Sequence, residues 1–238
     1  PDTPRSNAAF ASRLQLLTSN VNDLPGISSS SWAEAIPGAS SRVGMLFIYG
    51  GDSRTTAHAF HVSPKYFETM GIPLLRGRDF TDQDRDAILL SRSLASRFFG
   101  GNDAVGRFVL LDGEEIQGRV VAVSDDVQVQ PNDSPPPPQM YIPAAGTYRE
   151  RAIPAGFFLA RCSAGCTAAL RKDVRAMTGR IAGAESCYDW TGYPELMART
   201  GSPLVLRGSF FTAAAVLTLL IPTCGVFSVL YHQSVSRS

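Results

Sequence analysis

One uncharged stretch near the C-terminus is long enough to cross a lipid bilayer. It runs from Ser209 to Tyr231 as SFFTAAAVLTLLIPTCGVFSVLY, which is 23 residues without Asp, Glu, Lys or Arg. At a helical rise of about 1.5 Å per residue it spans roughly 35 Å, and the hydrocarbon core of a bilayer is about 30 Å thick. Lipid offers the backbone no hydrogen bonds, so a single crossing segment must be helical. We therefore predict a transmembrane helix over 209–231; the alternative is a helix buried in a protein core.

The same stretch is typical of a helix that packs against other membrane helices. Pro222 removes one backbone donor near its middle, and Gly225 and the alanines at 213–215 offer small surfaces for close approach. The charges on either side are too balanced to set its orientation in the membrane.

The preceding residues, 1–208, have the composition of a globular domain. The whole chain has 238 residues, of which 44% are hydrophobic and 18% are charged, and its net charge is +1. This length suffices for one large or two small domains with their own cores. A net charge near zero gives no reason to expect nucleic-acid binding. The chain opens PDTPRSNAAF, without a Met or a signal peptide, so we expect it to begin inside a longer protein.

Helical and strand patterns alternate along this part and predict a mixed α+β fold. Ser63 is expected to cap the second helix, with Pro64 at its first position. The predicted helices are 8–18, 63–70, 92–99 ending at Gly100, and 167–180. One predicted strand follows Gly26, and others cover 55–62, 86–91, 156–161 and 185–190. A hairpin is predicted within 107–128, turned at Asp112 and Gly113, and a short strand at the end of the proline-rich connector 131–143.

Two blocks, 8–71 and 155–190, share a helix-plus-strand pattern, whereas 72–143 is richer in strands. This arrangement predicts one subdomain built from both flanking blocks, with a second subdomain inserted in it.

The motifs of nucleotide chemistry are incomplete. Gly101 and Gly106 have the spacing of a phosphate loop, but Arg107 and Phe108 stand where Lys and Ser or Thr are required. We expect a turn between a helix and a strand here. No G-x-S-x-G nucleophile elbow occurs.

Metal-binding patterns are also incomplete. Asp82, Asp84 and Asp86 resemble the start of a calcium loop, but the required Gly and the final Glu are absent, so we expect a solvated turn. His58 and His61 are three apart on a predicted strand and therefore face opposite sides. We expect structural roles for both.

The cysteines leave two possibilities open. Cys162 and Cys166 are separated by three residues, which is not a usual zinc-site spacing, and Cys187 follows later in the domain. These residues are either free thiols or include a disulfide, the latter if the domain lies outside the cytoplasm. Cys224 lies in the predicted membrane segment.

Residues 60–84, FHVSPKYFETMGIPLLRGRDFTDQD, resemble the periplasmic core domain of MacB-type ABC-transporter permeases. The family pattern there is close to V-S-P-x-Y-F-x-x-x-G-I-P-L-x-x-G-R-x-F. The matching residues are Val62, Ser63, Pro64, Tyr66, Phe67, Gly71, Ile72, Pro73, Leu74, Gly77, Arg78 and Phe80.

The resemblance continues through the D-x-V-G-R turn at 103–107. It includes the strand 120–127, where Ala122 and Ser124 depart from the family's V-V-G-V-V-x-D-V. It covers about 55–238, and the 209–231 stretch falls where an FtsX-like transmembrane domain resumes.

The resemblance implies a mechanical role in a bacterial inner membrane rather than a catalytic one. It places a periplasmic core domain at 1–200 with an inserted subdomain at about 72–143, a juxtamembrane connector at 201–208 and a cytoplasmic end at 232–238. Residues 1–208 would then be extracytoplasmic. The expected partners are membrane lipid, the other helices of the permease, a cytoplasmic ABC ATPase, and a periplasmic adaptor or envelope protein. We expect no catalytic, cofactor-binding or metal-binding residues.

Two other classes of function stay open on the sequence. The chain could be a membrane-anchored docking module that recruits an envelope partner without transport. It could also be a membrane-anchored enzyme, which a cleft with convergent carboxylates or histidines would indicate.

Overall fold

The computed structural model describes residues 4–37, 44–50, 53–100, 103–111, 116–129, 135–144, 156–182 and 191–196. The chain divides into residues 1–190 and 191–238, and the elements below all belong to the first part. The predicted strand 185–190, the turn at 112–113 and the predicted membrane helix 209–231 lie outside the described residues. Within the described ranges, no helix is both long and apolar enough to cross a bilayer.

Helices and strands alternate in a mixed α and β fold. In chain order they are α1 (Pro4–Asn22), β1 (Ile27–Ala33), β2 (Gly44–Gly50), β3 (Ser53–Val62), α2 (Tyr66–Met70), β4 (Leu74–Gly77), β5 (Ala87–Ser91), α3 (Arg92–Phe99), β6 (Phe108–Leu111), β7 (Ile116–Ser124), β8 (Gln139–Pro143), β9 (Phe157–Cys162) and α4 (Ala168–Ala182).

Six of the described strands close into a ring, which we call the barrel. Their order is β2-β6-β7-β5-β8-β3, and β3 pairs back to β2. The pairs β3–β8 and β5–β7 are parallel, and the others in the ring are antiparallel. Alternate residues of these strands fill the interior, together with one face of α3. This core includes Ile48, Ala57, Ile88, Leu90, Leu94, Phe98, Val109, Val120, Met140 and Ile142.

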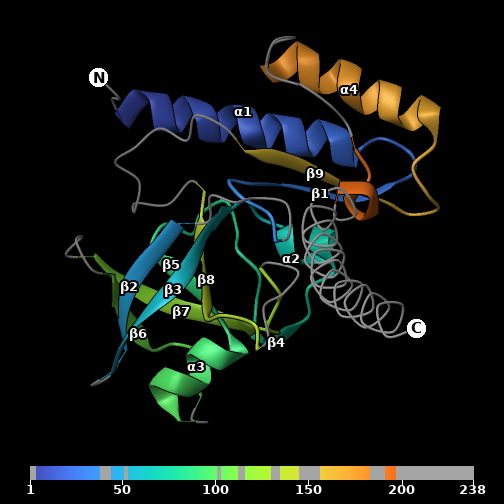
Figure 1. Cartoon of the computed structure of the whole chain (residues 1–238). Coiled ribbons are helices and arrows are strands. Elements are labelled where there is room, and N and C mark those ends of the chain that lie inside the picture. The colour runs from blue at the N-terminus through green and yellow to red at the C-terminus, as the bar shows by residue number, and fades with distance from the viewer. Residues whose placement is uncertain are drawn as a thin grey trace, which may run out of the picture. The chain divides into compact units, whose positions relative to one another are not determined.

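A second group of elements, which we call the helical layer, consists of α1, β1, β9 and α4. β9 pairs along the length of β1, from Ile27 opposite Cys162 to Ala33 opposite Phe157. The helices α1 and α4 lie side by side over these two strands (Figure 1). Leu17 and Val21 of α1 pack with Val174 of α4 in a small apolar core of their own.

The structure corrects the predicted start of the second helix. Ser63 is not its N-cap, because α2 begins at Tyr66 and follows Lys65, a residue in the left-handed region with φ 64° and ψ 11°. The Ser63 hydroxyl instead accepts a hydrogen bond from the backbone N–H of Trp32 at 2.8 Å. The first helix is also longer than predicted, running over Pro4–Asn22 rather than 8–18.

Several other predicted elements are confirmed. α3 ends at Gly100, whose φ of 59° is the usual left-handed helix end. β5 is buried at every position, and β6 and β7 form the predicted antiparallel pair, with Leu111 opposite Ile116. The predicted helix 167–180 corresponds to α4. The strands β2 and β4 were not predicted.

The strands of the first sequence block join both groups of elements. β2 and β3 pair with β6 and β8 of the middle block, while β3 also pairs with β1 at Ala33 and Val62. The strands near Thr55 and Phe157 therefore belong to one continuous sheet, with β1 between them. The boundaries of an inserted subdomain at about 72–143 stay a prediction.

Phe67 provides a test of the packing. Its side chain is 1% exposed and sits among other aromatic rings. We expect Phe67→Ala to lower the free energy of unfolding by about 3–5 kcal/mol in urea denaturation, because a large buried ring leaves a cavity. The matched control Leu75→Ala removes a side chain that is 44% exposed, and its effect should stay within about 0.5 kcal/mol. A loss below about 1 kcal/mol for Phe67→Ala would contradict the packing.

Candidate functional site: the α2 junction

The helical layer meets the barrel at β1, which is buried on both faces from Ser29 to Ala33. On one face, Ser30 donates to the backbone carbonyl of Thr18 in α1 (3.2 Å), and Trp32 packs with Leu14 of α1. The opposite face meets α2 and the end of β3. We call this second contact the α2 junction; it consists of β1, α2, the segment 62–65 and β9 around Arg161.

Hydroxyl groups fill the centre of the α2 junction. The side chains of Ser31 and Ser63 hydrogen-bond each other at 2.9 Å, and Ser31 also lies within 3.2 Å of the Ser63 carbonyl. The backbones of Trp32 and Ser63 add a bond from the Ser63 N–H to the Trp32 carbonyl (2.8 Å). Each of these buried polar groups therefore has a partner, which avoids the cost of desolvating it alone.

A second set of bonds ties α2 to the helical layer. Thr69 of α2 donates its hydroxyl proton to Ser29 Oγ (3.1 Å), and Arg161 Nε of β9 donates to the Thr69 carbonyl (2.8 Å). Gly71 ends α2 with φ 72°, and a Cβ there would lie 2.7 Å from an Arg161 guanidinium nitrogen. A side chain at this position would thus be strained and would displace Arg161.

Aromatic rings join α2 to the barrel. Tyr141 of β8 lies at their centre, with ring centroids 5.4 Å from Phe60, 5.8 Å from Tyr66 and 4.8 Å from Phe67. Phe80 closes the group at 6.4 Å from Phe67. Burial raises the pKa of the Tyr141 hydroxyl, which stays protonated and donates to Gln139 Oε1 (2.8 Å). The result is a block of aromatic rings in which the hydroxyl of the central residue, Tyr141, is hydrogen-bonded.

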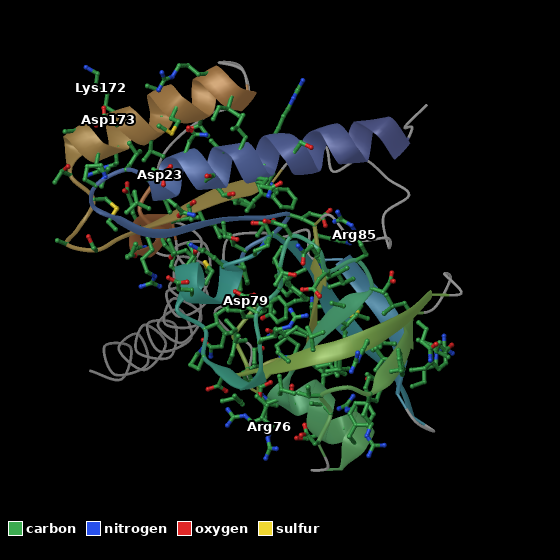
Figure 2. All side chains as sticks on the ribbon, turned by 180° about the vertical axis from the view of Figure 1, so that it is seen from behind. Asp23, Arg76, Asp79, Arg85, Lys172 and Asp173 are labelled. Carbon is green, nitrogen blue, oxygen red and sulfur yellow. A yellow bond between two sulfur atoms is a disulfide. The ribbon has the colours of Figure 1, made fainter. Side chains whose placement is uncertain are left out.

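Asp79 supports the turn that precedes α2. Among the described residues, Lys65 is the one non-glycine with a positive φ, a conformation that costs roughly 1–2 kcal/mol for an L-residue. Asp79 lies beside α2 (Figure 2), and its Oδ1 accepts the backbone N–H of Phe80 at 2.7 Å. Burial raises the pKa of Asp79 to about 6, with Glu68 adding to the rise, while backbone N–H groups of Phe80 and Lys65 oppose it. The Asp79 carboxylate thus links Lys65 and Phe80 across the turn.

The α2 junction is held by hydrogen bonds among buried hydroxyl and backbone groups. The interacting groups in and around it are hydroxyls, aromatic rings, the Arg161 guanidinium and the neighbouring Asp79 carboxylate, which accepts backbone N–H groups. In the described ranges, no group of three or more His, Cys, Asp or Glu residues is placed to hold a metal ion.

Comparison with known proteins now identifies this architecture. The sequence model described as MacB-like periplasmic core domain matches residues 6–177, which is most of the chain. The chain belongs to the MacB-like periplasmic core domain family. The predicted resemblance to MacB-type permeases is confirmed, and the match begins well before residue 55, so it also covers α1, β1 and β2.

Individual relatives agree with the family. The chain is 26% identical over 113 residues to the macrolide export ATP-binding/permease protein MacB of Aggregatibacter actinomycetemcomitans, and 29% identical over 123 residues to that of Mannheimia succiniciproducens. The alignments cover 46% and 50% of this chain but 17% and 18% of those relatives, so the chain spans a small part of their length. The crystal structure of the periplasmic region of MacB from Actinobacillus actinomycetemcomitans has the same fold, with a TM-score of 0.52, 15% identity and coverage of 72% of this chain and 75% of that one.

In this MacB-like domain the three aspartates of the predicted turn do not converge. Asp84 forms a two-pronged ion pair with Arg78 (2.7 and 2.9 Å) and also accepts bonds from the N–H and hydroxyl of Thr81. The Arg78 hydrogen bond is the main reason that the pKa of Asp84 falls to about 2. Asp82 instead accepts a bond from Gln15 of α1 (3.2 Å). These residues fasten a surface turn.

The glycine-rich turn at 103–107 is pinned to the barrel. Gly106 has φ 86° and donates its N–H to the Val120 carbonyl at 2.7 Å. The Arg107 guanidinium lies over the Phe99 ring, 5.7 Å from its centroid, and Phe108 points outward at 54% exposure. The predicted turn is confirmed for these residues, and Gly101 lies outside the described ranges.

The described histidines and cysteines, His58, His61, Cys162 and Cys166, take part in no group of three or more residues placed to hold a metal ion. His61 Nδ1 lies 2.6 Å from a carboxylate oxygen of Glu34, while the buried Nδ1 of His58 has no hydrogen-bond partner. Cys162 and Cys166 form a disulfide, so these two residues are not the free thiols that the sequence had left possible. Cys187 and Cys224 lie outside the described residues.

Sequence reasoning missed most of the α2 junction. It identified Tyr66, Phe67 and Ser63 through the family pattern, but it gave no role to Ser29, Ser31 or the Lys65–Asp79 contact. One available signal was the run of four serines at 28–31, followed by Trp32, in a predicted strand. Small hydroxyl side chains in a strand that is covered on both faces indicate close contact with a neighbouring element.

The Asp79 carboxylate predicts a specific pH dependence. Its pKa is about 6 in the fold against 3.8 for an unperturbed Asp, so between these values the folded chain binds more protons than the unfolded chain. Its contribution to stability therefore falls as pH rises from about 4 to 6. In paired urea titrations, the stability of the native chain relative to Asp79→Asn should decline across this window by at most about 3 kcal/mol.

Asp84→Asn serves as the control for this experiment. The pKa of Asp84 is lowered, so its contribution has the opposite sign and is lost as pH falls from about 4 towards 2. A difference between the native chain and Asp79→Asn that stays constant from pH 4 to 7 would rule out a raised pKa at Asp79.

Proposed function

We propose that this chain contains the extracytoplasmic domain of a MacB/FtsX-type ABC-transporter permease, which couples a cytoplasmic ATPase to conformational change outside the membrane. The transport process that this coupling drives would be efflux or export. The family match supports an extracytoplasmic location for the domain, since the matched domain is the periplasmic core domain. The observation that carries the mechanical part is the narrow connection at the α2 junction.

The backbone connection between the helical layer and the barrel is short. β1 and β3 share one ladder position, Ala33 opposite Val62, flanked by the bonds of Glu34 to His61 and of Ser63 to Trp32. By contrast, β1 pairs with β9 over six positions, and β2 pairs with β3 over seven. Two well-paired bodies joined by a short strand contact and a few hydroxyl bonds have the construction of a hinge.

The chain order indicates which body would receive the motion. α1 and α4, the first and last described helices of the domain, both belong to the helical layer. The proposed connector 201–208 and membrane helix 209–231 follow α4 in the sequence. We therefore propose that movement of the membrane helices reaches the helical layer first and the barrel second, through α2.

The remaining partners follow from the same proposal. The ATPase would be a separate domain or chain on the cytoplasmic side, and the other permease helices and lipid would surround residues 209–231. A periplasmic adaptor or envelope protein would receive the motion outside the membrane. Residues 232–238 would be cytoplasmic.

A reversible lock across the α2 junction tests the coupling. The hydroxyl oxygens of Ser29 and Thr69 are 3.1 Å apart on β1 and α2, so cysteines at both positions can form a disulfide. In the full permease, reconstituted with its ATPase and with all native cysteines changed to Ser, oxidation should reduce ATP hydrolysis to the uncoupled rate. Reduction of the lock should restore it.

The matched control is the single variant Thr69→Cys in the same cysteine-free background, for which oxidation should change nothing. Formation of the lock is confirmed by mass spectrometry of the linked peptides. Unchanged hydrolysis with the lock fully formed would exclude motion at the α2 junction as a step of the cycle.

The proposed topology can be tested separately. Gln83 is exposed in the described domain, and Ser236 lies beyond the proposed membrane helix. With cysteines placed singly at these positions, a membrane-impermeant maleimide should label position 83 in spheroplasts and position 236 only after lysis. Labelling of position 236 alone before lysis would reverse the orientation.

A further inference from the structure

The Cys162–Cys166 disulfide lies where β9 passes into α4. Cys162 is the last residue of β9, and Cys166 precedes Thr167 and the first residue of α4, so the bond closes a loop over residues 163–165. The proposed mechanical function does not use this bond.

The two residues of this disulfide differ in exposure to solvent. Every residue from Ser163 to Ala169 is exposed, Cys166 included, whereas Cys162 is half-buried. A Cβ added at Gly165 would meet no atom of the described residues beyond its chain neighbours within 4 Å, so the loop is open at that position. An attacking thiolate must reach one sulfur of a disulfide, and here access favours Cys166.

The surrounding structure has bonds that do not depend on the disulfide. Ser163 donates its backbone N–H to the Gly26 carbonyl at 2.9 Å and its hydroxyl proton to the same oxygen at 3.3 Å. The hydroxyl of Thr167 accepts the backbone N–H of Leu170 (3.2 Å), which caps the start of α4. The end of β9 therefore stays bonded to Gly26 when the sulfur–sulfur bond is cut, whereas the Thr167 bond lies within the first turn of α4 and does not tie that turn to another element.

The body of α4 is anchored further along the helix. Val174 is 3% exposed and packs with Leu17 and Val21 of α1. Lys172 and Asp173 project from α4 into solvent (Figure 2). Cleavage of the disulfide would thus release a short loop and the first turn of α4, not the helix as a whole.

We propose that the Cys162–Cys166 disulfide is a thiol–disulfide exchange site for a protein dithiol outside the cytoplasm. One thiolate of the dithiol attacks Cys166 Sγ, the bond to Cys162 breaks, and Cys162 leaves as a thiolate that takes up a proton. The second thiol then displaces Cys166 from the mixed disulfide. The domain gains two electrons and two protons as two thiols, and the dithiol is oxidised to its disulfide.

Reduction kinetics test the accessibility. The 238-residue chain in detergent, with Cys187 and Cys224 changed to Ser, is treated with dithiothreitol, quenched with N-ethylmaleimide and analysed by mass spectrometry. We expect the native chain to be reduced within about tenfold of the rate of the same chain unfolded in urea. A native rate more than about tenfold slower would overturn the proposal, because cleavage would then await unfolding.

Two single variants test which sulfur is attacked. Cys162→Ser leaves the thiol of Cys166, and Cys166→Ser leaves that of Cys162, in the same background. Iodoacetamide should modify Cys166 at least about tenfold faster than Cys162, as the difference in exposure requires. Equal rates, or a faster Cys162, would overturn the assignment.

Hydrogen exchange distinguishes a local effect of reducing the disulfide from a loss of the fold around it. After reduction, exchange should rise over 163–171 and stay unchanged over β1 and the central part of α4. Loss of protection throughout the helical layer would show that the bond is needed for folding, and the proposal would fail. These measurements use no ATPase and no membrane transport, and the lock experiment uses a chain without native cysteines, so either proposal can fail alone.

Discussion

The structure depends on β1, a strand that is buried on both faces although most of its own side chains are small. A strand between two helices normally needs large apolar residues, as parallel strands in α/β proteins have. In β1, serines at 29, 30 and 31 take those places, so α1 and α2 approach closely and every hydroxyl finds a bond. Hydrogen bonds of this kind contribute little net stability, on the order of 1 kcal/mol each, but leaving one unmade is costly. Such a contact selects one arrangement of its two sides without binding them as tightly as an apolar core would.

The two sides of this contact are stabilised differently. The barrel closes on itself and contains the largest apolar core of the described residues, capped by α3. The helical layer has a smaller core, shared by α1 and α4 with the strands beneath them. The aromatic rings around Tyr141 attach α2 to the barrel, whereas hydroxyl bonds attach it to β1. α2 thus contacts the barrel through aromatic rings and β1 through hydroxyl bonds, and the proposed coupling would use this asymmetry.

Much of the fold could be predicted because local patterns agree with the structure. The uninterrupted apolar run of β5 and the glycine that ends α3 act through their immediate neighbours, and both elements were placed correctly. Gly71 and Gly77, which match the family pattern, have φ values of 72° and 81°, a region that other residues rarely adopt. The start of α2 was misplaced because Ser63 has the features of a helix cap, but its bond to Trp32 comes from a strand 31 residues away in sequence. The Lys65–Asp79 contact and the four-residue strand β4 depend on such distant neighbours too, and no local pattern records them.

The pairing of β1 with β9 joins the two ends of the domain, and it has a consequence for how the chain acquires its fold. Ser28 bonds to the carbonyl of Arg161, across 133 positions of sequence. Contacts of such separation form slowly, because a long loop must close before any of them contributes. During synthesis, which begins at the N-terminus, the barrel strands can pair once residue 143 has been added. β1 must wait for β9, and α1 must wait for α4. The serine-rich strand therefore spends the longest time without its partner, and its hydroxyl side chains keep that waiting edge soluble where an apolar strand would aggregate.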